Sequence, residues 1–420
     1  MSALLRTVLG ALLGLLLAAS APAASTGAEP LRIAVIDTLS GPFALEGEAM
    51  VAHLRYLAGL FNRQGGVLGR PLEIQAYDNK GSPQETLVIL RDLIERGIQY
   101  VAQGNGSHVA GAILEAVEKH SRRQPDRPVL FLNYSALNPE LTNELCSFWH
   151  FRFDANTAMR LDALTDAIAT QEGLKRVFLI NQDYAHGHQV AALAREMLAR
   201  KAPWIEIVGD VLHPIGKVRD FAPYAARIRV SGAQAVITGN WGNDLSLLIR
   251  AGAEAGLEVA YYTFYAGGFG VPTAIGAAGN ERVYQVSEWH RDLPDEENRP
   301  DWADFADTFE RHTDGRIPWY FHRTHTLLSM LVKAMEQAQS THPRDVAYAL
   351  EGMEHETAFG PAYMRAEDHQ LLQPLFLSRF SRAARHEAEN SGFGWVTVRR
   401  IPAAATALPH NCRMQRPGRD

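Results

Sequence analysis

The chain has 420 residues, 46 % hydrophobic and 21 % charged, which is ordinary for a soluble globular protein large enough to form two domains or lobes. Its net charge is −6, and it contains no Lys/Arg cluster. Composition therefore excludes an electrostatic surface for nucleic acid.

The N-terminus has the pattern of a cleaved signal peptide over residues 1–23. Arg6 precedes the apolar run "TVLGALLGLLLAAS", and the small residues Ala21 and Ala23 follow at the spacing that a signal peptidase accepts. The run is shorter than the roughly 20 residues of a spanning helix, which an uncleaved anchor would need. No cysteine lies nearby, so we expect no lipid anchor there. The mature protein is predicted to be exported.

Strand-like and helix-like segments then alternate along the chain. Met50, Leu54, Leu57 and Phe61, for example, recur at helical spacing. Short apolar runs rich in β-branched residues predict strands at 31–38, 71–78, 98–103, 127–133, 175–181, 205–211, 233–239 and 259–265. This alternation predicts an α/β fold with parallel sheets covered by helices on both faces. It restarts after the irregular stretch 143–156, so two α/β units follow one another.

Ligands of such sheets bind where loops leave the carboxyl ends of the strands. This rule nominates six loops, which are rich in Gly, Ser, Asn or aromatic residues: 37–47, 102–111, 132–141, 180–189, 238–245 and 263–270. The final stretch, "IPAAATALPHNCRMQRPGRD", shows no periodicity and is expected to be a surface tail.

The loop "AQGNGSHVAG" joins a predicted strand to a predicted helix, as in anion sites. It is not a dinucleotide motif, because Val109 stands at the third glycine position, and no acidic residue ends the next strand. Two alternatives remain. The loop is a purely structural turn, or it holds a small carboxylate with the backbone of Gly106 and Ser107 and the Ser107 hydroxyl.

Other chemistry has weaker support in the residues. His186 and His188 are two apart, a spacing that faces different sides of a helix, so a solvated pair is favoured over a metal site. No G-x-S-x-G motif or Ser/His/Asp set indicates a hydrolase. Among the aromatics of "VAYYTFY", only Tyr265, at the end of the strand, is expected to line a cleft. We therefore expect no catalytic residues, no metal and no cofactor.

From about Leu31 to about Phe380 the chain resembles the hydrophobic (branched-chain) amino-acid-binding family, the periplasmic solute receptors that serve ABC importers. The resemblance is carried by "SGPFALEGEAMVAHLRYLAGLFNRQGGVLGRPLEIQAYD" and "SALNPELT", and "DYAHG" and "GPAYMRAEDHQ" agree with it. It implies a type I periplasmic binding fold: two Rossmann-like lobes joined by three crossing strands. Lobe 1 would hold 29–153 and 291–375, and lobe 2 would hold 154–290 and 376–420.

The resemblance also implies a ligand site. Ser107 matches the serine that takes a ligand carboxylate, Ser135 a residue whose backbone does the same, and Tyr184 the second-lobe aromatic at the cleft mouth. The other positions that match binding residues are Glu46, Trp241, Tyr265 and Tyr320.

Three positions depart from the family pattern. Leu137 stands where a threonine is usual, Trp241 where a tyrosine is usual, and Tyr265 where a glutamate pairs with a ligand ammonium. We therefore expect a carboxylate ligand, or an isosteric amide, with an apolar or aromatic body and weak recognition of any ammonium, since a buried ammonium needs an opposite charge. A branched-chain amino acid is the alternative, because the Glu46 carboxylate lies at another binding position.

The resemblance implies a periplasmic, monomeric binding protein that delivers a small molecule to an inner-membrane permease. A ligand sensor on the same fold and an exported hydrolase are the alternatives. The only two cysteines, Cys146 and Cys412, lie in an exported chain, so we expect a disulfide between them, with two buried free thiols as the alternative.

Overall fold

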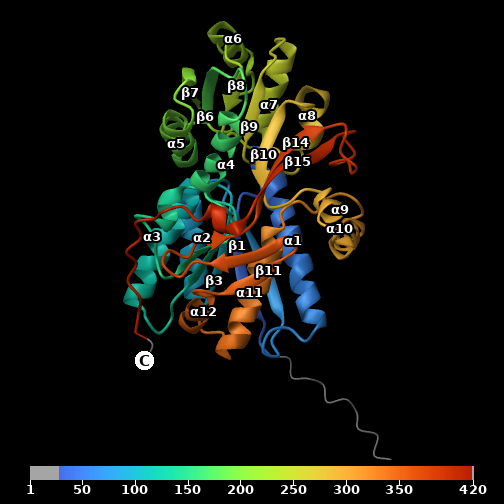
Figure 1. Cartoon of the computed structure of the whole chain (residues 1–420). Coiled ribbons are helices and arrows are strands. Elements are labelled where there is room, and N and C mark those ends of the chain that lie inside the picture. The colour runs from blue at the N-terminus through green and yellow to red at the C-terminus, as the bar shows by residue number, and fades with distance from the viewer. Residues whose placement is uncertain (1–27, 419–420) are drawn as a thin grey trace, which may run out of the picture.

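The computed structural model describes residues 28–418, so the predicted signal peptide lies outside the described residues. Two lobes, each built on its own sheet, are stacked one above the other (Figure 1). We call the lobe with the five-stranded sheet the first lobe and the one with the seven-stranded sheet the second lobe. The predicted two-lobed α/β fold is confirmed.

The first lobe begins with an all-parallel sheet in the order β2-β1-β3-β4-β5. Strand β1 buries side chains on both faces, including the adjacent residues Val35 and Ile36, as expected for a parallel sheet between helix layers. Its elements are β1 (Leu31–Asp37), η1 (Gly41–Phe43), α1 (Ala44–Arg63), β2 (Leu72–Asp78), α2 (Pro83–Glu95), β3 (Tyr100–Gln103), α3 (Ser107–Arg123), β4 (Leu130–Asn133), η2 (Pro139–Thr142) and β5 (His150–Arg152).

The second lobe has the sheet order β15-β14-β10-β9-β8-β6-β7, parallel from β7 to β10 and antiparallel at β14 and β15. Its first part consists of α4 (Thr157–Ala169), β6 (Arg176–Gln182), α5 (Ala185–Lys201), β7 (Glu206–His213), α6 (Ala222–Ser231), β8 (Ala235–Ile237), α7 (Gly242–Glu254), β9 (Ala260–Thr263), α8 (Val271–Gly279) and β10 (Val283–Ser287). All eight predicted strands are present, with ends that differ by no more than three residues.

The chain then returns to the first lobe, a return that local periodicity did not predict. This segment holds α9 (Leu293–Glu296), α10 (Pro300–His312), α11 (Arg323–Ala338), α12 (Pro343–Leu350) and a small antiparallel sheet of β11 (Glu354–Thr357), β12 (Gly360–Met364) and β13 (Leu371–Leu372). Helix α11 packs against α1 and buries Leu327, Leu328 and Leu331. Strands β14 (Leu375–Ser381) and β15 (Gly394–Ile401) then complete the second sheet.

The tail after β15 lies on the first lobe, in contrast to the sequence-based assignment of residues 376–420 to the second lobe. The 3-10 helix η3 (Ala403–Thr406) contacts β12 and β13, and Leu408 and Met414 pack against the core. Its path to the C-terminus is visible in Figure 1. The tail carries no apolar periodicity, so its position depends on tertiary contacts alone.

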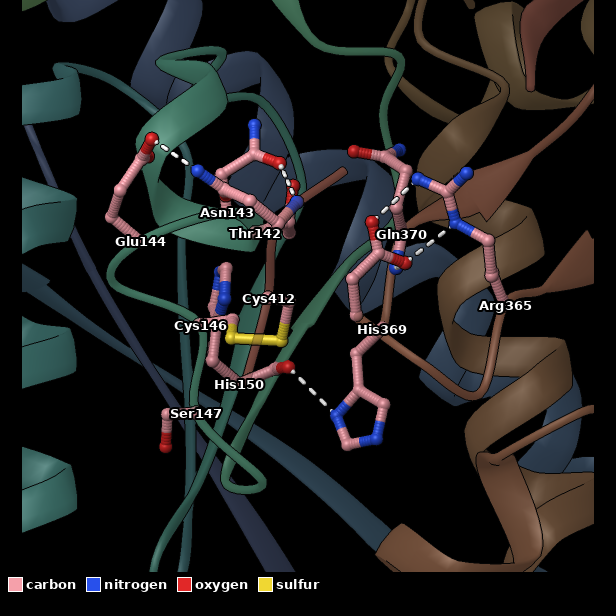
Figure 2. Close-up of a disulfide and its surroundings, with 12 residues drawn as sticks. Thr142, Asn143, Glu144, Cys146, Ser147, His150, Arg365, His369, Gln370 and Cys412 are labelled. Carbon is pink, nitrogen blue, oxygen red and sulfur yellow. Dashed lines mark hydrogen bonds and ion pairs between the residues drawn. A yellow bond between two sulfur atoms is a disulfide. The ribbon is translucent and has the colours of Figure 1, made fainter. Parts of the chain in front are cut away.

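The predicted disulfide is confirmed: Cys146 and Cys412 are bonded, with their Cα atoms 5.7 Å apart. Figure 2 shows this bond between Cys146 and Cys412. The backbone N of Asn411 lies 3.2 Å from Asn143 Oδ1, and its Nδ2 lies 2.7 Å from Glu144 Oε1. The bond therefore attaches the tail to the loop between η2 and β5 of the first lobe.

Candidate functional site

A small cavity of about 20 Å³ lies between the lobes, at the carboxyl ends of their strands. All six nominated loops contribute to its lining, which confirms that they meet in space. Of the predicted site residues, the structure brings eight together here: Glu46, Gly106, Ser107, Ser135, Leu137, Tyr184, Trp241 and Tyr265. Gly104, Asn105, Ala136 and His186 complete the lining and were not predicted.

Three helices begin at this cavity. Gly106, Tyr184 and Trp241 are the N-cap residues of α3, α5 and α7, and none of the three helix starts is capped by a side chain within the described chain. Helix starts carry unpaired N–H groups and partial positive charge. Asp244 lies in the first turn of α7, but its Oδ2 accepts hydrogen bonds from Gln182 and from the Gly216 backbone. The cavity is therefore suited to an anion.

Gly106 is needed for the backbone at the start of α3. Its φ is +93°, a conformation that side chains with a Cβ rarely adopt. A Cβ there would also lie 3.0 Å from Cε1 of His108. The glycine lets the chain turn sharply from β3, so that α3 starts at the cavity.

Ser107 and Ser135 each accept one hydrogen bond from the protein. The Ser107 Oγ accepts from the Asn138 backbone N at 3.2 Å, and the Ser135 Oγ accepts from Nη2 of Arg323 at 2.8 Å. Both hydroxyl protons remain available for donation, since a hydroxyl is both donor and acceptor. Both residues are buried.

Trp241 closes the cavity toward the first lobe. Its ring stacks on Phe43 with centroids 4.0 Å apart, and its Nε1 donates to the Tyr184 hydroxyl at 2.9 Å. Leu137, on the first-lobe side of the lining, is buried and presents only apolar atoms from its side chain. The wall around the helix starts is therefore aromatic and aliphatic.

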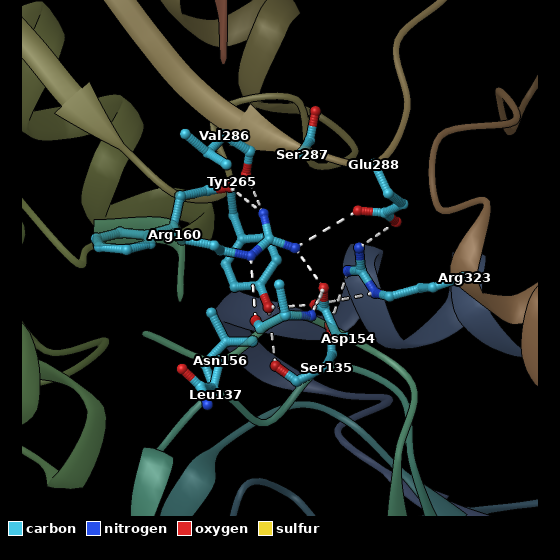
Figure 3. A network of polar contacts seen from close by, with 12 residues as sticks. Ser135, Leu137, Asp154, Asn156, Arg160, Tyr265, Val286, Ser287, Glu288 and Arg323 are labelled. Carbon is cyan, nitrogen blue, oxygen red and sulfur yellow. Dashed lines mark hydrogen bonds and ion pairs between the residues drawn. The ribbon is translucent and has the colours of Figure 1, made fainter. Parts of the chain in front are cut away.

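The Tyr265 hydroxyl is already engaged by the protein. It lies 2.9 Å from both the Ser135 carbonyl oxygen and Oδ2 of Asp154 (Figure 3). A hydroxyl has one proton, so it donates to one of these acceptors at a time. The guanidinium groups of Arg160 and Arg323 lie 5.1 Å and 5.4 Å from the Tyr265 ring centroid.

Behind Tyr265 lies a buried cluster of two acids and two arginines (Figure 3). Arg323 Nη1 contacts Glu288 at 2.6 Å, and its Nε lies 3.3 Å from Asp154. Arg160 pairs with Asp154 and lies 3.5 Å from Glu288. Mutual pairing offsets the cost of burying these charges. Asp154 and Glu288 follow β5 and β10, where the chain passes between lobes, so the cluster spans that junction.

Glu46 is the one acid that lines the small cavity. It is 4 % exposed, and its Oε1 has no hydrogen-bond partner among residues 28–418. Burial raises the pKa of its carboxyl to about 8, against the opposing effect of the Arg323 charge. A Cβ at Gly268 would lie 2.5 Å from this oxygen, so the glycine is what lets the second-lobe loop pass over Glu46.

Tyr320, the ninth predicted residue, does not line this cavity. It lines a larger neighbouring cavity, and its hydroxyl is 3.5 Å from the Glu46 backbone oxygen.

The prediction of a solvated histidine pair is wrong for His186. Its side chain is buried, with Nδ1 2.9 Å from the Thr157 hydroxyl, and burial lowers its pKa to about 3. His188 is exposed and contacts Asp183 at 2.8 Å. The helix turns the two side chains to different sides, as their spacing predicts. Within residues 28–418 no group of three His, Cys, Asp or Glu side chains is arranged to hold a metal ion.

The fold and cleft have clear relatives. The family model described as "Periplasmic binding protein" matches residues 30–385. The chain belongs to the periplasmic binding protein family. It is a substrate-binding protein of the Leu/Ile/Val-binding group, whose members serve ABC transporters in the periplasm. None of the helices between residues 28 and 418 is long and apolar enough to cross a membrane.

Two relatives at about one-third identity cover nearly the whole chain. The Leu/Ile/Val-binding protein homolog 4 of Brucella abortus is 33 % identical over 413 residues, covering 95 % of this chain and 96 % of its own. The closed leucine-, isoleucine-, valine-, threonine- and alanine-binding protein of Brucella ovis has a TM-score of 0.83 at 31 % identity, covering 93 % and 100 %.

A more distant solved structure shares the fold. A solute-binding protein of an R. palustris ABC transporter, in complex with benzoate, has a TM-score of 0.77 at 19 % identity, covering 91 % of this chain and 99 % of its own.

Proposed function

We propose that this protein binds a small carboxylate-bearing solute between its lobes and delivers it unchanged to an inner-membrane ABC permease. The observation that carries the proposal is the meeting of three uncapped helix starts with Ser107 and Ser135 at one cavity. Such starts attract anions. The relatives support it, because the amino acids and the benzoate in their names all carry a carboxylate.

In this proposal the lobes act as a clamp. The first lobe is 29–153 with 291–375, the second is 154–290 with β14 and β15, and residues 1–23 are removed on export. A solute that contacts both lobes stabilises the closed arrangement. A cavity of about 20 Å³ holds little more than one water, so the lobes must part to admit the solute. The protein acts as a monomer.

The solute's body is apolar or aromatic in our proposal. Leu137, Tyr184 and Trp241 supply such a wall, and the Tyr265 hydroxyl is committed to Ser135 and Asp154. Tyr265 therefore offers little to an ammonium.

Glu46 favours a second candidate, an amino acid. Its unpartnered Oε1 faces the cleft, and an ammonium beside it would stabilise the ionised carboxylate. The helix starts would hold the carboxylate of the same zwitterion. In this case the first lobe supplies the charge that Tyr265 lacks.

Calorimetric titration with matched pairs tests both candidates. The pairs are leucine with 4-methylpentanoate, phenylalanine with 3-phenylpropionate, and benzoate with benzamide. We expect the carboxylates to bind and benzamide to bind weakly. Binding of amino acids without their deaminated partners would favour the Glu46 candidate, and benzamide binding as tightly as benzoate would contradict the carboxylate proposal.

Ser107→Ala gives the corresponding variant test. Loss of a hydrogen bond to a charged group should weaken carboxylate binding roughly 10- to 100-fold. Ser231→Ala, at the end of α6 and remote from the cavity, is the matched control and should leave affinity unchanged. Equal affinity of both variants would contradict the assignment of Ser107.

A further inference from the structure

A second and much larger cavity, of about 730 Å³, adjoins the first. Tyr265 lines both. The larger cavity is lined by residues of α8 and α10, whereas the small one is lined at the starts of α3 and α5. These two pairs of helices lie on opposite sides of the molecule in Figure 1. Its volume is in the range of sites for small organic molecules.

Both lobes build this cavity. The second lobe contributes the loop before α8, residues 386–390 between β14 and β15, and Trp395. The first lobe contributes the connection between α10 and α11. Residues 289–291, in the segment that connects the two lobes after β10, also line the cavity. Glu389 joins two parts of the second-lobe wall, residues 386–390 and the start of α8. Its carboxylate accepts hydrogen bonds from the Gly270 backbone N at 2.6 Å and from the Thr273 hydroxyl at 2.7 Å.

The lining is rich in aromatic rings. Besides Phe264 and Tyr265, they are Phe269, Trp289, Trp319, Tyr320, Phe321 and Trp395. Tyr320 and Phe321 pack with ring centroids 3.9 Å apart, and Phe269 lies 6.4 Å from Tyr320. A planar aromatic molecule gains both apolar contact and ring stacking against such a lining.

The lining residues of this cavity include several hydrogen-bond donors that have no partner in the described part of the chain. The lining acids Glu389 and Glu387 accept hydrogen bonds from neighbouring backbone. By contrast, Arg291 Nη1, Trp319 Nε1 and Trp395 Nε1 are buried without an acceptor anywhere in residues 28–418. Buried donors without acceptors are costly, so a small side-chain rotation that brings one of them to an acceptor of an occupant is favoured.

Charge points the same way. The other terminal nitrogen of the Arg291 guanidinium, Nη2, pairs with Asp307. Arg316 at the wall is exposed: its Nε donates to the Thr313 carbonyl oxygen at 3.1 Å, and its Nη2 lies 3.8 Å from Asp314. Glu310 is the remaining acid of the lining, and burial raises the pKa of its carboxyl. Arginine side chains suit a carboxylate.

We propose that the 730 Å³ cavity is a second small-molecule site, which takes an aromatic carboxylate and is separate from the cavity at Ser107. Its occupant contacts both lobes and therefore stabilises the arrangement in which they approach. Binding there is linked to solute binding at the first cavity through that shared arrangement.

The test uses 4-fluorobenzoate, followed by fluorine NMR and calorimetry, on the full mature chain. Ala388→Trp fills the larger cavity and does not touch the small one. Ala383→Trp, exposed on the same loop, is the matched control. The unmodified protein and Ala383→Trp should bind two equivalents, one in each cavity. Ala388→Trp should weaken one of these two binding events at least tenfold, and Ser107→Ala should retain the equivalent in the larger cavity.

Two results would overturn the proposal. One is loss of all 4-fluorobenzoate binding in Ser107→Ala with full binding in Ala388→Trp. The other is no binding of the probe to the unmodified protein at millimolar concentration. If Ala388→Trp does not fold, the variant Arg291→Gln tests the proposal instead. The proposal requires that this variant loses preference for 4-fluorobenzoate over 4-fluorobenzamide, and an unchanged preference contradicts it.

Discussion

Replacing Glu46 by glutamine should stabilise the protein and remove much of a pH dependence that its carboxyl imposes. Glu46 is buried in the cleft with one carboxyl oxygen unpartnered, and burial raises its pKa from 4.5 to about 8. Glutamine has nearly the same shape and does not ionise. Any pH dependence of stability that remains in Glu46→Gln therefore belongs to the other titratable groups.

The magnitude follows from linkage. In the folded protein the carboxyl holds its proton up to about pH 8, whereas in the unfolded chain it releases the proton near pH 4.5. Its contribution to stability therefore falls as pH rises through this window and is constant above it. The full change is roughly 5 kcal/mol, and roughly 3 kcal/mol is lost by pH 7. Opening of the cleft would rehydrate the carboxylate, so we expect about 1–3 kcal/mol.

Urea unfolding at pH 5 and pH 8 measures this directly. The unmodified protein should lose more stability between these values than Glu46→Gln does. Glu48→Gln, an exposed position on the same helix α1, is the matched control and should behave like the unmodified protein. Equal pH dependence of the unmodified protein and Glu46→Gln would refute the reasoning.

Three further predictions concern the disulfide and the buried cluster. Thiol titration of denatured, unreduced protein should find no free thiol, and two reactive thiols would contradict the bond. Cys412→Ser should cost at most about 5.6 kcal/mol, the chain-entropy ceiling for a separation of 266 residues. Arg323→Met should lower unfolding free energy by roughly 3–5 kcal/mol, because Glu288 and Asp154 stay buried with less compensating charge; an unchanged urea midpoint would count against it. Tyr265→Phe should cost about 1–2 kcal/mol through the lost hydroxyl donor, measured in the same assay, and a neutral or stabilising change would be the contrary result.

Local sequence was sufficient for much of the architecture. Apolar runs placed eight of the first nine strands, all except β5, to within three residues, because each element buries a face whose period is written into its own residues. The glycine turn before Ser107 likewise indicated a helix start at the carboxyl end of a strand, and α3 begins there. Two cysteines in an exported chain were enough to pair Cys146 with Cys412.

Other features depended on which distant residues meet. Glu288 and Arg323 come from segments far along the chain from Asp154 and Arg160, and no local pattern distinguishes a charge that is buried in a cluster from one that is solvated. The same holds for His186, whose burial comes from packing around Thr157.

Tertiary structure also decided the roles of Tyr265 and the tail. Tyr265 was predicted to face a ligand, yet its hydroxyl contacts Ser135 and Asp154, both more than 100 positions away. The tail has no periodicity, and its place on the first lobe comes from the Cys412 bond and from Leu408 and Met414 in a core made by other segments. Local sequence carries the period of a buried face, whereas the partner of a polar or unpatterned residue is set only when the chain has brought distant segments together.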